Sequence, residues 1–131
     1  MPSNNLILFI VSRVKKVLLI KQAGKKALWT LPSIRSPLKD GFTYAAYQCL
    51  QPYFRDLTVI RIKYIRAPVK DITFSDEHRR LILMGCDIRG TIKKKMRYHV
   101  WFTDLKNIMH HIAIPGTVEI LSLPEVQNRL A

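Results

Sequence analysis

The chain has 131 residues, of which 48% are hydrophobic and 24% are charged, a composition that fits one globular domain and excludes a disordered or fibrous protein. Its 22 Lys and Arg residues outnumber 9 Asp and Glu residues and give a formal net charge of +13. A domain this basic is expected to meet an anion, such as RNA, a nucleotide phosphate or an acidic membrane surface. The whole chain has three glutamates, Glu77, Glu119 and Glu125, so chemistry that needs clustered carboxylates is poorly supplied.

Two apolar runs near the start predict two strands. Residues 6–11 and 17–21 are rich in Leu, Ile and Val, and a short basic segment separates them. The first run has six residues and is followed, not preceded, by basic residues, so it fits neither a membrane span nor a signal peptide. Residues 23–26 predict a turn, and an irregular stretch is expected over residues 29–41.

An amphipathic helix is predicted next. From Phe42 to Tyr53 the apolar residues recur at i, i+3, i+4 and i+7, and Pro52 would remove a hydrogen bond from the helix interior, so the helix is expected to end early or kink. Cys49 falls on its buried face and Cys86 in a later buried segment, without C-x-x-C spacing. Both are expected to be free core thiols in a protein that is cytoplasmic or in another reducing compartment and not secreted.

The second half of the chain predicts a sheet and a final helix. Strands are predicted over residues 57–65, 81–88, 98–104 and 117–121, and an exposed hairpin connection over residues 89–97. Ser122 and Glu125 have the spacing of a capping box that opens a short terminal helix. Residues 1–131 are therefore expected to form a single α+β domain, an α/β/α sandwich.

The first of these later strands shows strict alternation. Ile60, Ile62 and Tyr64 alternate with Arg61 and Lys63, which predicts one buried face and one basic face.

The order of these elements resembles the Nudix hydrolase family. The family's second strand has the form K-V-L-L-V-K and the segment before its helix W-x-L-P-G-G, and here residues 16–21 read KVLLIK and residues 29–34 read WTLPSI. Ala45 and Ala46 stand where the family often has two alanines, and residues 119–126 resemble its closing strand and helix. The resemblance spans nearly the whole chain. It implies a Nudix-like mixed β-sheet with one helix after the Nudix loop and a C-terminal helix, in a family that often forms dimers.

The Nudix box itself departs from the family's pattern. In G-x5-E-x7-R-E-U-x-E-E-x-G-U the helix glutamates bind divalent metal, whereas residues 42–55 of this chain contain no carboxylate. The motif's glycine, first glutamate, Arg-Glu pair and Glu-Glu pair fall on Ile34, Asp40, Gln48, Cys49, Pro52 and Tyr53. Mg²⁺ needs oxygen ligands that this set does not supply, so no metal, no cofactor and no catalytic residue are expected.

Other acids and histidines leave alternatives open. If the chain were a divergent Mg²⁺-dependent Nudix pyrophosphohydrolase acting on a nucleoside diphosphate derivative, Asp40, Asp76 and Glu77 would carry catalysis, although the last two read more simply as part of a solvated turn. His110 and His111 have no acid or cysteine at ligand spacing, so a surface pair is expected rather than a metal site.

Positive charge beside aromatic residues is the remaining functional signal. The candidate nucleic-acid or phosphate-binding residues are Lys25, Lys26, Trp29, Arg61, Lys63, Lys93, Lys94, Lys95 and Arg97. Lys and Arg give salt-dependent affinity for phosphate, and exposed aromatic rings stack bases at roughly 1–3 kcal/mol each. Trp101 is predicted to lie in the core, whereas Trp29 is left open between core and site.

These patterns favour a non-catalytic Nudix-fold protein that binds RNA or nucleotide, or acts as a basic subunit of a ribonucleoprotein. The pyrophosphohydrolase is one alternative. A protein-interaction subunit with an acidic partner is the other, and no membrane partner is expected.

Overall fold

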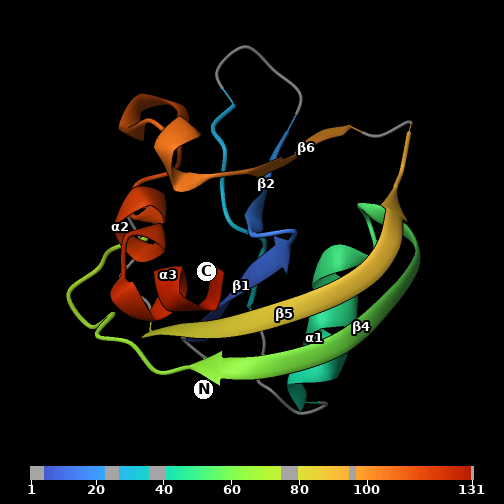
Figure 1. Cartoon of the computed structure of the whole chain (residues 1–131), viewed down its shortest axis with the longest axis horizontal. Coiled ribbons are helices and arrows are strands. Elements are labelled where there is room, and N and C mark those ends of the chain that lie inside the picture. Colours follow the sequence, from blue (N-terminus) through green and yellow to red (C-terminus); the bar gives the residue numbers. More distant parts are fainter. Residues whose placement is uncertain (1–4, 23–26, 36–40, 75–79, 95–96, 131) are drawn as a thin grey trace.

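The computed structural model describes residues 5–22, 27–35, 41–74, 80–94 and 97–130. These residues form strands, α-helices (α) and short 3₁₀ helices (η), coloured along the chain in Figure 1. In chain order they are β1 Asn5–Arg13, β2 Lys16–Gln22, β3 Ser33–Arg35, α1 Gly41–Leu50, β4 Phe54–Ile65, β5 Arg80–Ile92, β6 Tyr98–Thr103, η1 Leu105–Asn107, η2 His110–Ile112, α2 Thr117–Leu121 and α3 Pro124–Leu130.

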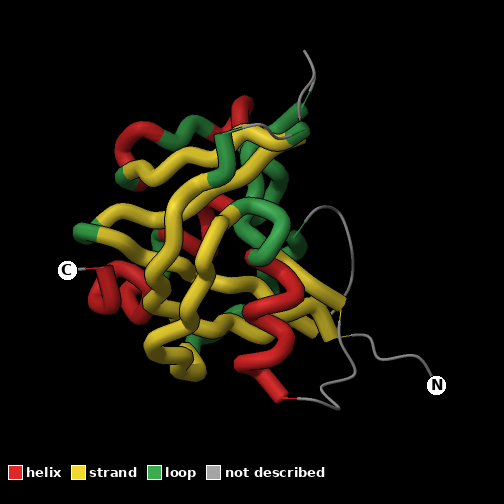
Figure 2. The backbone as a smooth tube through the Cα atoms, turned by 90° about the vertical axis from the view of Figure 1, so that its right-hand side faces the viewer, coloured by secondary structure: helices red, strands yellow, loops and turns green. Residues whose placement is uncertain are grey.

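One mixed sheet organises the chain. Its strands lie in the order β4-β5-β1-β2-β6, and β3 pairs with β1 on the side of this path. β1 runs parallel to β5 and antiparallel to β2 and β3, while β4 and β5 form a long curved antiparallel ribbon (Figure 1). Figure 2 shows α1 and α3 on opposite sides of the strands. This arrangement confirms the predicted α+β class with a mixed sheet.

The central strand β1 explains the apolar run at residues 6–11, because both of its faces are buried. Leu6, Leu8 and Ile10 join a core cluster with residues of α2 and α3, whereas Ile7 and Phe9 join a second cluster with α1. A strand covered by helices on both faces reads as a continuous apolar segment instead of an alternating one. The two core clusters therefore fix α1 on one face and the C-terminal helices on the other.

Helix α1 follows the sequence prediction closely. It begins at Gly41, whose φ of +85° is left-handed, and ends at Leu50, before Pro52. Its buried residues include Ala45, Ala46 and Cys49, which face the sheet at helical spacing. A proline needs a residue before it that avoids helical geometry, which is why the helix stops at this point.

Two further segments differ from the prediction around this helix and after β5. Within the expected irregular stretch, Ser33–Arg35 pairs with β1 as β3. Residues 89–92, expected in a hairpin connection, continue β5 and pair with the start of β4 through Thr91 and Ile92.

The strand predicted over residues 117–121 is wrong, because this segment is the helix α2. Gly116 precedes it with a φ of +94°, a left-handed conformation that turns the chain into the helix. Thr117, Ile120 and Leu121 are buried at i, i+3 and i+4, so helical packing against the core overrides the β-preference of the branched residues.

The terminal helix is confirmed as α3, but the predicted capping box is wrong. Ser122 Oγ donates a hydrogen bond of 2.7 Å to the carbonyl oxygen of Val118, one turn back. Ser122 therefore ends α2. Pro124 is the first residue of α3, a position where its missing N–H costs nothing.

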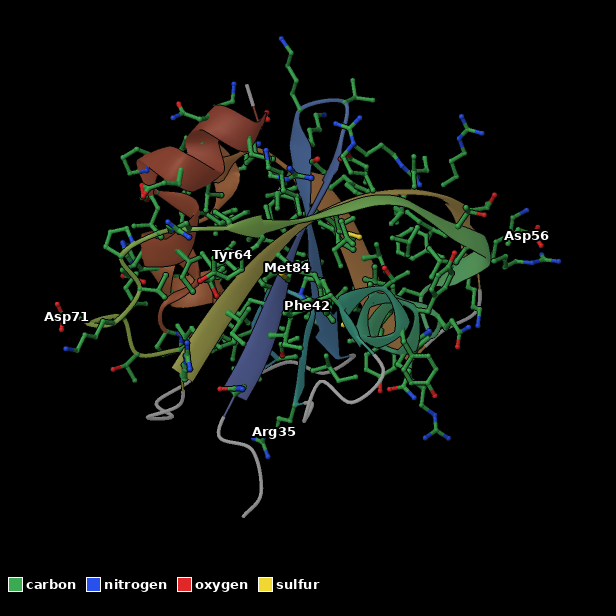
Figure 3. All side chains as sticks on the ribbon, turned by 90° about the horizontal axis from the view of Figure 1, so that it is seen from below. Arg35, Phe42, Asp56, Tyr64, Asp71 and Met84 are labelled. Atoms are coloured by element: carbon green, nitrogen blue, oxygen red, sulfur yellow. The ribbon has the colours of Figure 1, made fainter. Side chains whose placement is uncertain are left out.

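The predicted buried face of residues 57–65 is wrong for Ile60 and Tyr64, which are 54% and 52% exposed. β4 is an edge strand whose pairing with β5 shifts register twice, and the second shift, between Val59 and Arg61, leaves Ile60 outside the ladder. Asp56 lies at the first shift, at the outer end of β4 (Figure 3), with a left-handed φ of +54°.

Candidate functional site

The position that the resemblance assigns to metal-binding glutamates is apolar in this structure. Cys49 is buried, and its Sγ donates to the carbonyl oxygen of Ser33 at 3.6 Å. Burial, and to a smaller extent the neighbouring Cys86, raises the pKa of Cys49 to about 12. Burial also raises the pKa of Tyr53 to about 12, with smaller contributions from Cys49 and Tyr98. Both side chains are therefore neutral at physiological pH.

The remaining matched positions do not add ligands. Gln48 is exposed, and its Nε2 donates to the hydroxyl of Tyr44 at 2.9 Å, while Pro52 has no side-chain donor or acceptor. A neutral thiol, a neutral phenol, an amide and a proline do not fit Mg²⁺, which prefers carboxylate and water oxygens in octahedral geometry. Within the described ranges no three His, Cys, Asp or Glu residues are grouped so that they could hold a metal ion. Asp40, Asp76 and Glu77 lie outside the described residues.

The cysteines are buried and the histidine pair lies at the surface, as the sequence predicts. Cys49 and Cys86 are free and buried. His110 and His111 are both exposed and lie on the 3₁₀ helix η2. His110 Nδ1 is 3.5 Å from the Glu119 carboxylate, an exposed contact at the surface.

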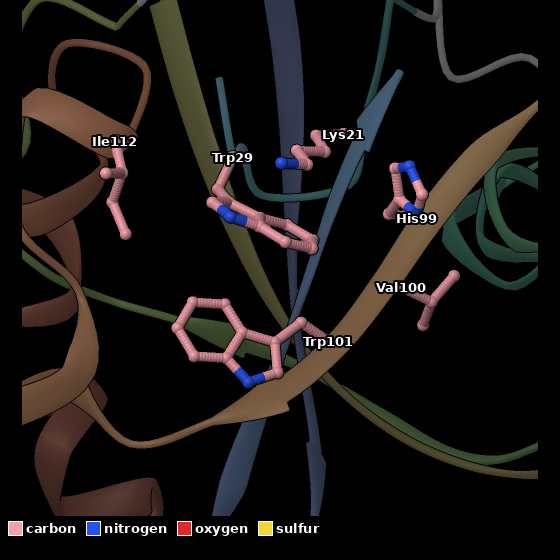
Figure 4. A pocket seen from close by; sticks show the side chains of 6 residues that line it. All are labelled: Lys21, Trp29, His99, Val100, Trp101 and Ile112. Atoms are coloured by element: carbon pink, nitrogen blue, oxygen red, sulfur yellow. The ribbon is translucent and has the colours of Figure 1, made fainter. Parts of the chain in front are cut away.

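A pocket of about 410 Å³ lies on the other face of the sheet, over β2 and β6 (Figure 4). We call it the tryptophan pocket, and it is lined by Lys21, Trp29, His99, Val100, Trp101 and Ile112. The ring centroids of Trp29 and Trp101 are 5.2 Å apart, with the ring planes tilted by 50°. Lys21 Nζ lies 4.8 Å from the centroid of Trp29, which is cation–π geometry. The pocket thus presents indole faces beside a positive charge.

Strand pairing brings these side chains together. In the antiparallel pair of β2 and β6, Lys21 lies opposite His99 and Leu19 lies opposite Trp101. Residues two apart on a strand share a face, so Lys21, His99 and Trp101 point to the same side. His99 is exposed and Trp101 is half-buried. The predicted core position of Trp101 is confirmed in part: its ring packs against the core cluster, and the edge strand β6 leaves one side of it open to the pocket.

Trp29 is held in place by its backbone on both sides. Its N–H donates to the carbonyl oxygen of Ile112 at 2.8 Å, and its own carbonyl accepts from the N–H of Ile114 at 2.8 Å. The next residue, Thr30, exchanges two backbone hydrogen bonds with Ile20 of β2. These bonds fix the backbone of Trp29 beside β2, and its ring packs against Trp101 and Lys21.

A second cavity of about 410 Å³ shares Lys21 with the tryptophan pocket and reaches towards the end of α1. Its lining includes Thr30, Tyr53 and Tyr98, and the two tyrosine rings meet edge to face with centroids 5.3 Å apart. Lys21 therefore has space on two sides, which is consistent with a ligand larger than one aromatic ring.

The structure separates the sequence-predicted basic residues. Trp29 lines the tryptophan pocket, whereas Arg61 and Lys63 lie on β4, at the opposite edge of the sheet order. Lys93, Lys94 and Arg97 belong to the connection between β5 and β6, and Lys25, Lys26 and Lys95 lie outside the described residues.

Sequence reasoning missed Lys21 and His99, which line the pocket together with the predicted Trp29. Lys21 could have been noticed as a lysine near the end of an otherwise apolar strand. His99 could not, because it meets Lys21 only through the pairing of β2 with β6.

No family model matches the chain, and no curated protein matches it in sequence. Solved structures match its fold. An ADP-ribose pyrophosphatase from Streptococcus suis superposes with a TM-score of 0.70 at 13% identity, over 98% of this chain and 92% of that one. A MutT protein from Aliivibrio salmonicida or Vibrio cholerae gives a TM-score of 0.60 at 14% identity, over 96% and 95%. Tm1382, a proposed Nudix hydrolase, gives 0.56 at 11% identity, over 80% and 60%.

These similarities establish that the chain has the Nudix fold, as the sequence resemblance predicted. At such low identity they concern the fold alone. None of the helices within the described residues has the length and apolar character needed to cross a membrane.

Proposed function

We propose that this Nudix-fold chain is a non-catalytic protein that binds RNA or nucleotide in the tryptophan pocket. The observation that carries the proposal is the placement of Lys21 Nζ over the ring of Trp29, with Trp101 facing it at 5.2 Å. A base can stack on an exposed indole face, and a lysine and an exposed histidine beside it suit a phosphate. The net charge of +13 favours any polyanion that carries such a base.

The apolar surroundings of α1 support the non-catalytic half of the proposal. Cys49 and Tyr53 take positions that the resemblance gives to metal-binding glutamates, and both are buried with a raised pKa. Ligand binding at the tryptophan pocket needs neither of them. A basic protein of this kind would suit a subunit of a ribonucleoprotein.

Tryptophan fluorescence tests the proposal directly, because Trp29 and Trp101 are the two tryptophans of the chain. Titration at low salt with AMP, ADP-ribose and an oligouridylate is expected to quench the emission. Trp101→Ala should weaken binding by roughly 1–3 kcal/mol, about fivefold to 150-fold, as loss of one stacked base predicts. Calorimetry measures this variant independently of fluorescence.

Tyr44→Ala is the matched control, because it removes an exposed aromatic ring of α1 that is not part of the pocket lining. It should bind like the unaltered chain. Failure of the unaltered chain to bind any of these compounds at low salt would overturn the proposal.

The fold similarity to an ADP-ribose pyrophosphatase and to a MutT protein favours one second candidate, a divergent metal-dependent pyrophosphohydrolase. Asp40, Asp76 and Glu77 would have to supply its carboxylates. Phosphate release that requires Mg²⁺ or Mn²⁺ and disappears in Asp40→Asn or Glu77→Gln would support this candidate over the binding protein. Activity that survives both substitutions would indicate a contaminating enzyme.

A further inference from the structure

We infer that the outer part of the β4–β5 ribbon is a second binding surface, which holds the phosphodiester backbone of single-stranded RNA. We call it the basic sheet face and define it by four exposed side chains: Arg55, Arg61 and Lys63 of β4 and Arg89 of β5. The inference rests on the proposed function and deepens it, because it identifies RNA rather than a free nucleotide as the ligand.

Strand register places these four side chains on one face. Arg61 lies opposite Asp87 and Lys63 opposite Gly85, while Arg89 lies opposite Thr58. Opposed residues of an antiparallel pair project from the same side of the sheet, and so do residues two apart on one strand. Arg55, opposite Thr91, extends the same face towards the start of β4.

The two register shifts of β4 remove apolar side chains from this face. In a regular strand Leu57 and Val59 would share a face with Arg61 and Lys63. Each shift inserts an extra residue. The second shift turns Leu57 and Val59 towards the core cluster under α1, and the first places Arg55 on the same face as Thr58. The bulges thus give β4 a polar, basic surface, although its polar and apolar residues do not alternate strictly.

Within the part of the chain that the structure describes, the positive charge of this face is only partly offset by carboxylates. Asp87 is its carboxylate, but Asp87 Oδ1 accepts a hydrogen bond from Ser12 Oγ at 3.2 Å and lies 3.7 Å from a guanidinium nitrogen of Arg129. Within the described ranges, the four side chains of the basic sheet face form no ion pair with a carboxylate. A bound polyanion would supply countercharge to these exposed cations.

Arg129 adds a fifth cation at the border of this face. Its side chain crosses from α3 onto β5 at Gly85, opposite Lys63, where a Cβ would leave no room for it. Its Nε is buried and has no hydrogen-bond partner in the described structure. The guanidinium is therefore held over the strand by packing and by Asp87.

The surface suits a nucleic-acid backbone better than a protein partner. Protein interfaces depend on a desolvated core of aromatic or aliphatic anchors, and this face presents Thr58 and Thr91 between its cations. Alternate residues on a strand are about 7 Å apart, which is of the order of the distance between successive phosphates of an extended strand. Exposed cations on a strand bind phosphates without reading sequence.

The tryptophan pocket and the basic sheet face lie towards opposite edges of the sheet. The pocket lies over β2 and β6 and the basic face over β4 and β5, with β1 between them in the strand order. A mononucleotide can occupy the pocket alone, whereas an oligonucleotide can reach both. Length-dependent affinity is therefore expected, with the added affinity sensitive to salt.

The test compares two charge-removing double variants. Arg61→Gln/Lys63→Gln alters the basic sheet face, and Lys70→Gln/Lys106→Gln removes the same charge from exposed positions elsewhere. The probe is a fluorescently labelled oligouridylate of about 16 nucleotides, titrated by anisotropy across a series of salt concentrations. Log K falls with log salt, and each lost phosphate contact makes that slope less steep by about 0.7, so the slope of the first variant should be less steep by about 1.4. The control variant should keep the slope.

The outcomes separate this inference from the proposed function. If every charge variant still binds AMP, and only Arg61→Gln/Lys63→Gln makes the salt dependence of oligouridylate binding less steep, the result supports both the pocket and the basic sheet face. An equal slope in the two double variants overturns the basic sheet face and leaves the pocket intact. A slope lost in the face variant while Trp101→Ala changes nothing supports this inference and overturns the pocket. If the basic sheet face binds an acidic protein after nuclease treatment but binds no RNA, the inference of an RNA-binding surface is overturned.

Discussion

Arg129 of α3 lies directly over Gly85 of β5, in the space that the side chain of any other residue at position 85 would fill. The same guanidinium lies 3.7 Å from Asp87, two residues further along the strand. The absence of a side chain at one position thus lets the C-terminal helix place a cation on the sheet.

Gly85→Ala should therefore displace Arg129 rather than break the strand, because the atoms in the way are the far end of a flexible side chain. We expect the free energy of unfolding to fall by about 1–3 kcal/mol, as for other overpacked sites, measured by urea denaturation. In an Arg129→Ala background the same substitution should cost much less, since the two residues share one interaction. Equal costs in both backgrounds would contradict this account.

Gly116→Ala should be far more damaging than Gly41→Ala, although both glycines have a left-handed φ. A Cβ at Gly116 would lie 2.5 Å from the carbonyl oxygen of Thr73 and 3.0 Å from the Cα of Phe74, whereas one at Gly41 would meet nothing within 4 Å. We expect Gly41→Ala to cost about 1–2 kcal/mol from strain alone and Gly116→Ala at least about 3 kcal/mol. Thermal or urea unfolding compares them, and similar costs would refute the clash with the backbone.

Gly116 also shows why part of the fold was not predictable from sequence. β1 and α1 were predictable because local patterns fix them: a continuous apolar run, helical spacing and Pro52. The helical start of α2 at Gly116 and the exposure of Ile60 depend on close approach to a distant loop and on pairing with β5. Such tertiary effects leave no local pattern, so β-branched residues suggested strands.

The candidate site divides in the same way. Trp29 was recognisable as a candidate because it follows basic residues in a turn. Its neighbours Lys21, His99 and Trp101 meet it only through the pairing of β2 with β6, which joins segments about 80 residues apart. The bulges that keep Leu57 and Val59 off the basic sheet face are equally non-local.

Tyr47→Phe should destabilise the chain more than Tyr44→Phe. The hydroxyl of Tyr47 accepts the backbone N–H of Val59 at 3.0 Å in a partly buried contact that ties α1 to the edge strand β4. The hydroxyl of Tyr44 accepts from Gln48 on the exposed side of α1. We expect a loss of about 1 kcal/mol for Tyr47→Phe and less than about 0.5 kcal/mol for Tyr44→Phe, from urea denaturation. A reversed order would show that the tie to β4 carries no stability.

The free energy of unfolding should fall as the pH rises from about 9 towards 12, because buried thiols stay protonated in this range and exposed thiols do not. Burial raises the pKa of Cys49 and of Cys86 from 9.0 to about 12. In this window the unfolded chain loses these protons and the folded chain keeps them, so the unfolded state binds fewer protons and gains relative stability. Below pH 9 both states are protonated and the stabilisation is complete.

Denaturation midpoints at pH 8 and pH 10.5 measure this effect, and Cys49→Ala should reduce the difference between them. Tyr53, raised from 10.0 to about 12 mainly by burial, should contribute in the same direction above pH 10. At pH 8 neither thiol should react with a disulfide reagent until the chain unfolds. Fast labelling of the folded chain would contradict the buried positions.

Lys21→Gln should distinguish a phosphate contact from simple stacking in the tryptophan pocket. Lys21 Nζ lies 4.8 Å from the centroid of Trp29 and lines both neighbouring cavities, so it can meet a phosphate while a base contacts the indoles. The substitution should weaken AMP binding by about tenfold, since a charge-assisted hydrogen bond contributes about 1.5 kcal/mol or more, and should leave adenosine binding nearly unchanged. Calorimetry with both ligands provides the comparison, and Lys70→Gln is the charge-matched control. If adenosine and AMP lose affinity equally, Lys21 orders Trp29 and does not contact the phosphate.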